Sequence, residues 1–471
     1  MSHPLNVLYV VAGVLLLFGA AIFVHEWGHF IVARWRGLKV EAFAIGMGPK
    51  IFSWVRDGID YSVRWIPAGG FVRLPQMITS ETLEGGSEAR EKLPPVSPWS
   101  KILVALAGPA MNVVFAFVIA TVIYFTGLPV LVNPSIIGYL DPKSPEAQLG
   151  IREGDKIVAV DGKPVKSWQD VQELTVLART NVLNVVIERG TERKTYQLTT
   201  EVNPAVGLKM LRLDPRDHPE VVEVLPGQAG EAAGLKLKDV VHYFAGMPIS
   251  SREQLISLIE KRPGQPTQMV VQRGDEKVTL TVTPRLNPVT NKGRIGVALG
   301  NSSATIYQVQ KPGPTPWDHM SEVWTKTINV LSALVHSKQT GVGVKDLSGP
   351  PGILALLAAY INTDYRLALS FLVLLNVNLA VLNLLPVPVL DGGHILMALV
   401  ERIRRRPLSV KFVEYTTTAF AVLLISFMLY VSFNDFRRIA LFKSMFQGET
   451  KVEPSETTPS PAPAPAPAPA K

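Results

Sequence analysis

His25-Glu26-Trp27-Gly28-His29 lies inside an apolar stretch that runs from residue 5 to about residue 33. On a helix, residues four apart share a face and lie about 6 Å apart along the axis. His25 and His29 can therefore offer two imidazoles to one metal ion. Glu26 adjoins the first of them, where a carboxylate can take a proton from a metal-bound water. Imidazole nitrogen suits zinc, which is the ion that this pattern predicts.

A coincidental match is the alternative, and it is expected in roughly one or two per cent of chains of this length and histidine content. The flanking residues argue against coincidence, because Phe23-Val24 precedes the motif and Phe30-Ile31-Val32 follows it. Ionisable side chains are costly in such an apolar segment and usually have a function there. The pattern therefore favours a metal site.

Composition excludes several classes of protein. The chain has 471 residues, 47% of them hydrophobic, and a formal net charge of +8. The excess of basic residues lies beside apolar runs, at 34–39 and 402–406, as is typical of cytoplasmic loops next to a membrane. No base-reading fold or aromatic-interleaved basic stripe is evident, so we expect no nucleic-acid partner. The absence of cysteine excludes disulfides, thiolate zinc sites and cysteine nucleophiles.

Four apolar segments are long enough to cross a lipid bilayer, at about 6–33, 102–128, 367–390 and 415–433. We therefore predict a multi-pass α-helical membrane protein with about four spans. The first segment lacks a basic start and a cleavage site, so it does not resemble a removable signal peptide. Positive charge follows it only at its C-terminal end, which predicts the N-terminus outside and His29 towards the cytoplasm.

Residues 38–74 predict a membrane-associated β-hairpin or sheet. Alternating runs at 40–45, 51–55 and 61–66 flank a turn at Asp57-Gly58, and the last run stops at the segment 67–70. Such a sheet next to the first helix could pair with an extended substrate strand. An ordinary surface hairpin fits the pattern equally well.

An internal repeat fills the polar middle of the chain. The stretch 144–162 recurs at 227–246, and each copy is followed by a helical stretch and a strand–turn–strand pattern. Two copies of one supersecondary unit predict two inserted α+β domains. An amphipathic helix is expected within 311–338, a short re-entrant or interfacial apolar helix at 353–361, and a disordered Pro-Ala tail from residue 448.

The third ligand is sought in another span, because catalytic zinc usually has three protein ligands. Residues 383–394 carry two prolines and two glycines, which should break the helix where it lines a polar cavity. Asp391 in this break is the natural candidate, although a loop aspartate beyond the membrane is the alternative and His394 is a rival ligand. We prefer Asn383 to Asn378 as an active-site hydrogen-bonding residue, because it is nearer to Asp391. Asn112 is expected to have a generic packing role.

These motifs together resemble the site-2 protease family of intramembrane zinc metalloproteases, in particular its bacterial branch that cleaves anti-sigma factors. The resemblance rests on 25–29, on 383–392, on Gly108-Pro109 with Asn112, and on 347–350, and it covers nearly the whole chain apart from the tail. It also identifies the two repeats as PDZ-like domains.

The resemblance implies that His25, His29 and Asp391 bind Zn2+ and that Glu26 is the general base. Residues implied to contact substrate are Gly46 and Gly48 of a membrane-re-entrant β-loop, together with Asn383 and Asn378. The implied substrates are single-span transmembrane proteins, such as anti-sigma factors or signal-peptide remnants. The implied location is the bacterial inner membrane, with the PDZ-like domains outside the cytoplasm and the active site towards it.

The expected division of the chain combines composition with this resemblance. It comprises a first transmembrane helix (1–37), a re-entrant β-loop (38–75), a loop (76–99), a second transmembrane helix (100–130), two PDZ-like domains (133–213 and 214–302), interfacial helices with a Gly-rich loop (311–362), a third transmembrane segment (365–406), a fourth transmembrane helix (411–440) and a tail (448–471). Two other classes of function remain open, namely a PDZ-bearing membrane scaffold with a non-catalytic metal site and a zinc transporter. Neither requires a base such as Glu26 between two ligands.

Overall fold

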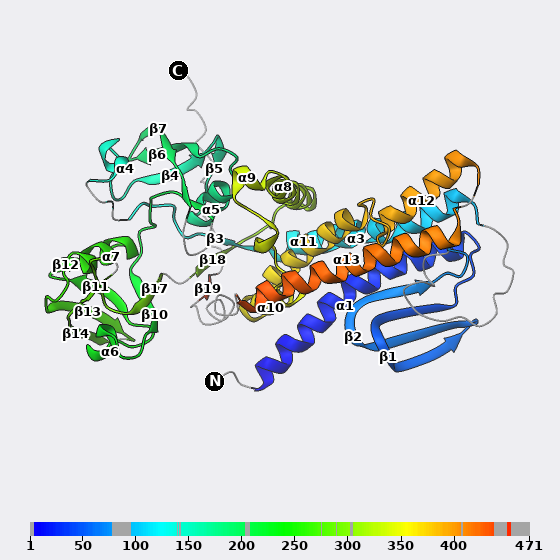
Figure 1. Ribbon diagram of the computed structural model, residues 1–471, viewed down its shortest axis with the longest axis horizontal. Coiled ribbons are helices and arrows are strands. Elements are labelled where there is room, and N and C mark those ends of the chain that lie inside the picture. Colours follow the sequence, from blue (N-terminus) through cyan, green and yellow to red (C-terminus); the bar gives the residue numbers. More distant parts are fainter. Residues whose placement is uncertain are drawn as a thin grey trace, which may run out of the picture.

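The protein consists of a helical lobe and a lobe of two α/β units, joined by a narrow stalk (Figure 1). This computed structural model describes residues 4–77, 96–138, 140, 143–202, 208–274, 276–288, 290–301, 305–406, 408–437 and 450–453. Most of the predicted loop at 76–99 and of the tail from 448 lies outside these residues.

Four of the described helices are long and apolar enough to cross a membrane. They are α1 (Pro4–Trp35), α3 (Pro98–Thr126), α11 (Tyr365–Asn383) and α13 (Val410–Arg437). Small residues such as Ala21, Ala116 and Ala120 let α1, α3 and α11 approach one another closely in a shared core. The predicted multi-pass helical membrane architecture is confirmed at this level.

The helix α13 is attached to the other helices chiefly near its two ends. The carboxylate of Asp435, near its C-terminal end, accepts a hydrogen bond of 2.8 Å from the backbone N–H of Gly352 in α10 (Pro350–Thr363). At the other end, Val413 lines a small cavity with Lys101 and Glu401. Between these points most of its large apolar side chains are exposed, as expected for a helix that faces lipid.

The break after α11 is confirmed, and it positions the next helix. The segment 384–390 is non-helical, and α12 (Asp391–Arg404) starts directly after it. A Cβ atom on Gly392 would lie 2.3 Å from the carbonyl oxygen of Leu384, so the turn folds back tightly where only glycine fits. Lys101 of α3 and Glu401 of α12 form an ion pair of 2.8 Å that fixes the far end of α12.

The small sheet beside α1 has two long strands, β1 (Ala42–Arg56) and β2 (Ile59–Arg73), joined at the predicted turn. The prediction that the last run stops at 67–70 is wrong, because β2 continues through these residues to Arg73. Both strands bend at glycines with positive φ, at Gly46 and Gly48 in β1 and at Gly69 in β2.

These bends make four sheet segments out of two strands. Ala44 in the first half of β1 pairs with Phe71 on one side and with Ser62 on the other. The segment 70–73 is therefore an edge of the sheet, and the segment 52–56 is the opposite edge. The sheet lies beside α1, in contact with the helix that carries the H-E-x-x-H motif (Figure 1).

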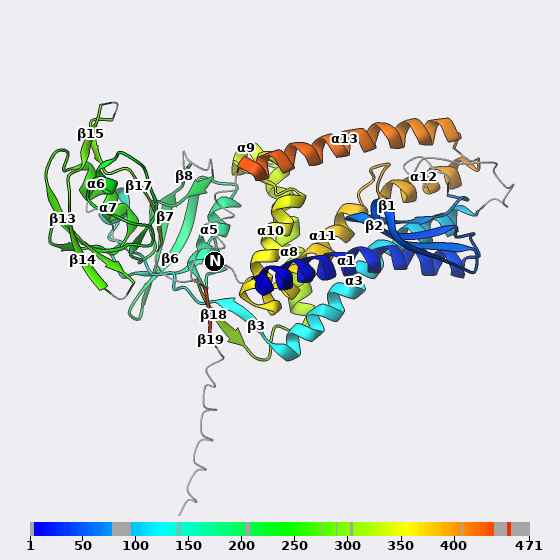
Figure 2. The ribbon, with the colours of Figure 1, turned by 90° about the horizontal axis from the view of Figure 1, so that it is seen from below.

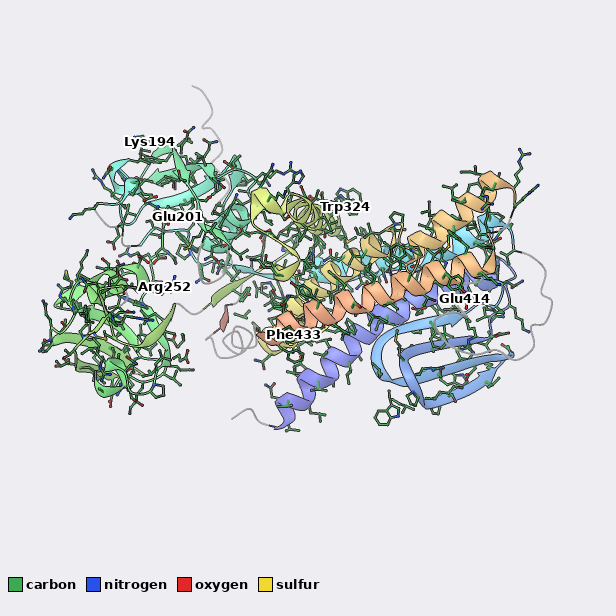
Figure 3. All side chains as sticks on the ribbon, in the orientation of Figure 1. Lys194, Glu201, Arg252, Trp324, Glu414 and Phe433 are labelled. Carbon is green, nitrogen blue, oxygen red and sulfur yellow. The ribbon has the colours of Figure 1, made fainter. Side chains whose placement is uncertain are left out.

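The predicted amphipathic helix is α8 (Pro316–Val335). It buries His319, Val323 and Thr327 towards the helical lobe, whereas Trp317 and Trp324 are exposed on its other face (Figure 3). It is followed by α9 (Ser337–Thr340), the 3₁₀ helix η1 (Val344–Asp346) and α10, which occupies the position of the predicted short apolar helix.

The two repeats form two separate α/β units with their own cores. The first contains α4 (Pro145–Gln148), β4 (Lys156–Val160), β5 (Lys163–Pro164), α5 (Trp168–Val176), β6 (Val182–Arg189) and β7 (Glu192–Thr199) in a sheet of order β5-β4-β6-β7, with β8 (Glu201–Val202) and β9 (Lys209–Met210) as a further pair. The second contains β10 (Pro219–Val224), α6 (Ala229–Ala232), β11 (Val240–Phe244), β12 (Met247–Pro248), α7 (Arg252–Glu260), β13 (Thr267–Arg273), β14 (Glu276–Val282) and β17 (Val297–Asn301) in a sheet of order β14-β13-β11-β10-β17, with β15 (Arg285–Asn287) and β16 (Lys292–Arg294) as a further pair.

An identical buried ion pair holds each unit together. Arg189 donates to Asp155 in the first unit and Arg273 donates to Asp239 in the second, and each arginine also donates to the backbone carbonyl of a glycine 39 residues earlier. Burial opposes ionisation of Asp155, but the hydrogen bonds from Arg189 and from the backbone hold its pKa below the usual value. This carboxylate therefore stabilises the unit above the unfolded-state pKa, and the stabilisation is lost as acid titrates the lowered pKa.

We expect Arg273→Leu to destabilise the second unit by about 2–3 kcal/mol, because the fully buried Asp239 carboxylate loses its counter-charge. Hydrogen exchange of the full chain measures the effect, in β11 and β13 for Arg273→Leu and in β6 and β7 for the control in the first unit. The matched control is Arg193→Leu, whose partner Glu188 lies on the surface, so its effect should stay below about 1 kcal/mol. Equal loss of protection in both variants would contradict the prediction.

The stalk is a small sheet of three strands, in the order β19-β18-β3. Two of them are chain connections between the lobes, β3 (Leu128–Leu131) and β18 (Thr305–Gln310), and the third is β19 (Thr450–Glu453). The prediction of disorder from residue 448 is therefore wrong for 450–453. These four residues form a strand because they pair with β18, a partner nearly 150 residues away in the chain that their local sequence does not reveal.

Candidate metal centre

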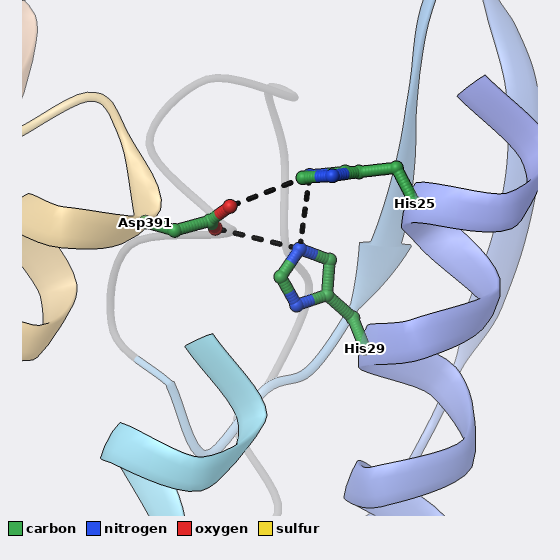
Figure 4. A group of neighbouring side chains, drawn as sticks. All are labelled: His25, His29 and Asp391. Carbon is green, nitrogen blue, oxygen red and sulfur yellow. Dashed lines mark hydrogen bonds and ion pairs between the residues drawn. The ribbon is translucent and has the colours of Figure 1, made fainter. Parts of the chain in front are cut away.

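Two helices bring three ligand-type side chains to one point. The helical spacing places His25 and His29 on the same face of α1, with their ring centroids 4.8 Å apart. Asp391 reaches them from the start of α12 (Figure 4). Its two carboxylate oxygens lie 3.3 Å from His25 Nε2 and 3.4 Å from His29 Nε2.

This arrangement fits a divalent metal ion. One ligand atom from each of His25, His29 and Asp391 lies within 4.8 Å of the others. Asp391 Oδ2 is buried and, apart from the 3.3 Å approach of His25 Nε2, has no hydrogen-bond partner, so an acceptor is left for a cation. Two imidazole nitrogens and one carboxylate oxygen are a typical protein ligand set of catalytic zinc. The donor set and its geometry therefore suit zinc.

Both histidines are oriented through their other ring nitrogen. His29 Nδ1 donates to the backbone carbonyl of Val104 at 2.7 Å, which leaves Nε2 free for a metal. The side-chain amide of Asn112 lies 3.0 Å from His25 Nδ1 and is fully buried. With the amide rotated so that its oxygen faces the ring, Asn112 accepts the Nδ1 proton, and its buried Oδ1 gains a hydrogen-bond partner.

Asn112 therefore does more than the generic packing that the sequence led us to expect. A buried amide 3.0 Å from His25, a candidate ligand, can hold that ring in position. Its signal in the sequence was an asparagine in the middle of a span, where an unpaired amide is costly.

Close approach of α1 and α3 depends on two glycines. A Cβ atom on Gly28 would lie 2.4 Å from the carbonyl oxygen of Ala107. A Cβ atom on Gly108 would lie 2.3 Å from His29 Nε2 and 2.8 Å from the His25 ring. Any larger residue at either position would separate the helices or displace the imidazoles.

Glu26 lies next to the sheet. The residue is buried, with 9% of its surface exposed. A Cβ atom on Gly70 would lie 2.8 Å from Glu26 Cγ and 3.1 Å from Ile22 Cγ2, so the edge segment 70–73 runs directly against α1 at this level. The carboxylate expected to act as a base is therefore adjacent to a sheet edge.

The other predicted site residues differ in their placement. Asn383 is brought to the cluster, with Nδ2 3.4 Å from His25 Nε2. Asn378 is not, because its Oδ1 accepts a hydrogen bond from Thr327 of α8 at 2.6 Å. Gly46 and Gly48 lie in the bend of β1. The rival ligand His394 lines a small cavity with Lys101 and Glu401 and is not part of the three-residue group.

We expect Asn112→Ala to weaken zinc binding by about 10–100-fold, because His25 loses the group that orients its ring. Competition with a chelator measures the affinity of the full-length protein in detergent or nanodiscs. Asn376→Ala is the matched control, since Asn376 is equally buried in a span but donates to its own helix at Leu372. Unchanged affinity in Asn112→Ala would refute the positioning role.

Comparison with known proteins agrees with this geometry. The model of peptidase family M50 matches residues 13–427. A zinc metalloprotease of Ralstonia nicotianae, named as putative, is 31% identical over 89% of this chain and 96% of its own length. The regulator of sigma-E protease RseP of Escherichia coli is 28% identical over 92% of this chain and all of its own length.

A further relative and one solved structure complete the comparison. A zinc metalloprotease of Vibrio cholerae, also named as putative, is 29% identical over 92% of this chain and its own full length. The solved PDZ domain of an SdrC-like protein from Listeria monocytogenes matches 18% of this chain and 87% of its own, with 18% identity and a TM-score of 0.17. On the family match, this chain belongs to peptidase family M50 and is a zinc metalloendopeptidase of the site-2 protease type.

Proposed function

We propose that this protein hydrolyses a peptide bond within the transmembrane segment of single-span membrane proteins, and that anti-sigma factors are among its substrates. The observation that carries the proposal is the convergence of His25, His29 and Asp391 from separate membrane-lobe segments, with Glu26 beside both the ligands and a sheet edge. Relatives named as regulators of sigma-E protease support the class of substrate.

In this proposal His25, His29 and Asp391 hold the zinc ion. When bound, zinc polarises the scissile carbonyl and makes water acidic enough to attack at neutral pH. The chain's contribution is to hold the three ligands together in a largely buried site. Val104 and Asn112 support it by fixing the two ring orientations.

Glu26 is the proposed general base. Its carboxylate takes a proton from the attacking water and returns it to the leaving amine nitrogen. Asn383, beside His25, has an amide N–H that can donate to the substrate carbonyl as negative charge develops there. Both roles require the substrate backbone to pass between the ligand cluster and the sheet.

The edge segment 70–73 is proposed to hold that backbone in an extended form. The carbonyl of Arg73 accepts a hydrogen bond from the backbone N–H of Glu41, so it points into the sheet. The backbone groups of successive strand residues point to opposite sides. Val72, one residue earlier, therefore directs its N–H and carbonyl away from the sheet. A transmembrane helix hides its amides in internal hydrogen bonds, and a strand edge replaces them as the helix unwinds. Gly46 and Gly48 contribute through the bend that shapes this sheet.

The orientation in the membrane follows from charge. Arg34, Arg36 and the basic residues at the end of α12 lie at the end of the helical lobe near the metal centre, which supports the proposal that this centre faces the cytoplasm. The two α/β units then lie outside the cytoplasm at the other end (Figure 2). We propose that both units are PDZ-like domains that restrict access of substrates with large external domains.

We expect Glu26→Gln to lower cleavage of a reconstituted single-span substrate by about 100-fold or more, because an amide cannot accept the proton. Zinc content should stay at the parental level, since the three ligands are untouched. Asp391→Ala should lose zinc as well as activity. If Glu26→Gln cleaved as fast as the parent protein, the catalytic proposal would be wrong.

Gly70→Ala should lower cleavage by about tenfold or more while zinc binding is retained, because the new methyl group would displace either Glu26 or the edge segment. Gly19→Ala in α1 is the control, because no atom lies within 4 Å of its added Cβ. The paired readout of cleavage and zinc affinity separates a local effect on Glu26 from collapse of the metal centre. Loss of zinc in Gly70→Ala would argue against the proposed placement of the edge.

A further inference from the structure

The two lobes are connected by only two passages of the described chain, and both are strands of the stalk. The chain leaves the helical lobe through β3 and returns through β18, and the strands pair antiparallel from Leu128 with Gln310 to Leu131 with Tyr307. Their base is fixed on the helical lobe, because Gly313 donates through its backbone N–H to the carbonyl of Tyr124 in α3. Motion of the α/β units against the membrane must bend this ribbon.

A third strand makes the ribbon stiffer. β19 pairs parallel with the other edge of β18, with Val452 opposite Tyr307. A two-stranded ribbon is marginally stable in water at best, and a third strand stabilises it when the sheet has a hydrophobic face or packs against a helix. Once β19 is in place, β18 becomes the central strand of the three. Burial, with a smaller effect of Tyr360 in α10, raises the pKa of Tyr307 to about 12.

β19 belongs to the part of the chain that follows the last transmembrane helix, α13. The end of α13 is tied to α10 through Asp435. The stalk therefore unites the chain after α3, the chain before α8 and the chain after α13 in one sheet (Figure 2). The segment connects the last transmembrane helix to the hinge of the α/β units.

We propose that the edge of β18 is a strand-binding site, that its occupant is the chain's own segment 450–453, and that this strand is a releasable clamp on the hinge between the two lobes. Release is feasible because β19 has four residues, pairs in parallel and lies at a sheet edge beyond which no other described strand is paired. Its departure leaves β3 and β18 paired, so the stalk loosens without unfolding.

Pulsed electron paramagnetic resonance tests the clamp in the full-length protein in nanodiscs. Spin labels at Lys261→Cys, directly after α7, and at Lys338→Cys in α9 report the distance between the lobes, and the parent chain has no cysteine to interfere. Deletion of 450–471 should widen the distance distribution by about twofold, because the ribbon loses its third strand. Deletion of 454–471, which keeps β19 and removes the rest of the tail, should leave the width unchanged.

A cross-link tests the pairing separately from the motion. Tyr307→Cys with Val452→Cys should form a disulfide in the oxidised full-length protein, and Tyr307→Cys with Leu131→Cys on the neighbouring strand serves as the positive control for stalk geometry. Equal distribution widths in all three chains, or a widening that needs only the loss of 454–471, would overturn the clamp. Failure of the Tyr307–Val452 cross-link beside a positive control would overturn the pairing itself. Neither measurement depends on proteolysis.

Discussion

The structure depends on bringing three polar ligands together inside an apolar lobe. Charged and ionisable groups are costly at membrane depth, so His25, His29 and Asp391 can persist there only in contact with one another or with a cation. That contact requires α1, α3 and α12 to approach closely. Gly28 and Gly108 permit the first crossing, and Gly392 permits the tight turn that delivers Asp391.

The sheet is held at the same level by aromatic packing. Phe30 of α1 contacts Phe43 and Tyr61 of the sheet edge-on, with ring centroids 5.4 and 6.1 Å apart. Trp27 packs on Phe30 one turn further along the same helix face. The H-E-x-x-H helix thus presents ligands on one face and aromatic rings on another, and the second face fixes the position of the sheet edge beside Glu26.

The two α/β units are stabilised by their own cores and not by contacts within the helical lobe. Each has a closed apolar core and its own buried arginine–aspartate pair, so each can keep its shape without the membrane. The first unit also contacts the surface of the helical lobe, where Arg179 donates a hydrogen bond to Ser332 of α8. The narrow stalk therefore concentrates any relative motion of the lobes in a few residues.

Local sequence was sufficient for the elements whose signals lie within a few residues. The four-residue spacing of His25 and His29, the Asp57-Gly58 turn and the proline–glycine break before α12 each follow from φ/ψ preferences and helical period. The repeat also predicted two similar units, because its pattern recurs along the chain. A third ligand was anticipated as a carboxylate in another span, from the coordination needs of zinc.

Other features depend on contacts between segments far apart in the chain. Three examples are the continuation of β2 through 67–70 to pair with β1, the pairing of 450–453 with β18, and the orientation of Asn378 towards Thr327. In each case the outcome depends on which surface a distant segment offers. The sequence predicted only a packing role for Asn112, and the structure shows its side-chain amide 3.0 Å from His25 Nδ1. Local sequence patterns determine the backbone conformation and the buried face of a single element. Which distant segment that element packs against depends on the free energy of the whole folded arrangement, so only the tertiary structure decides it.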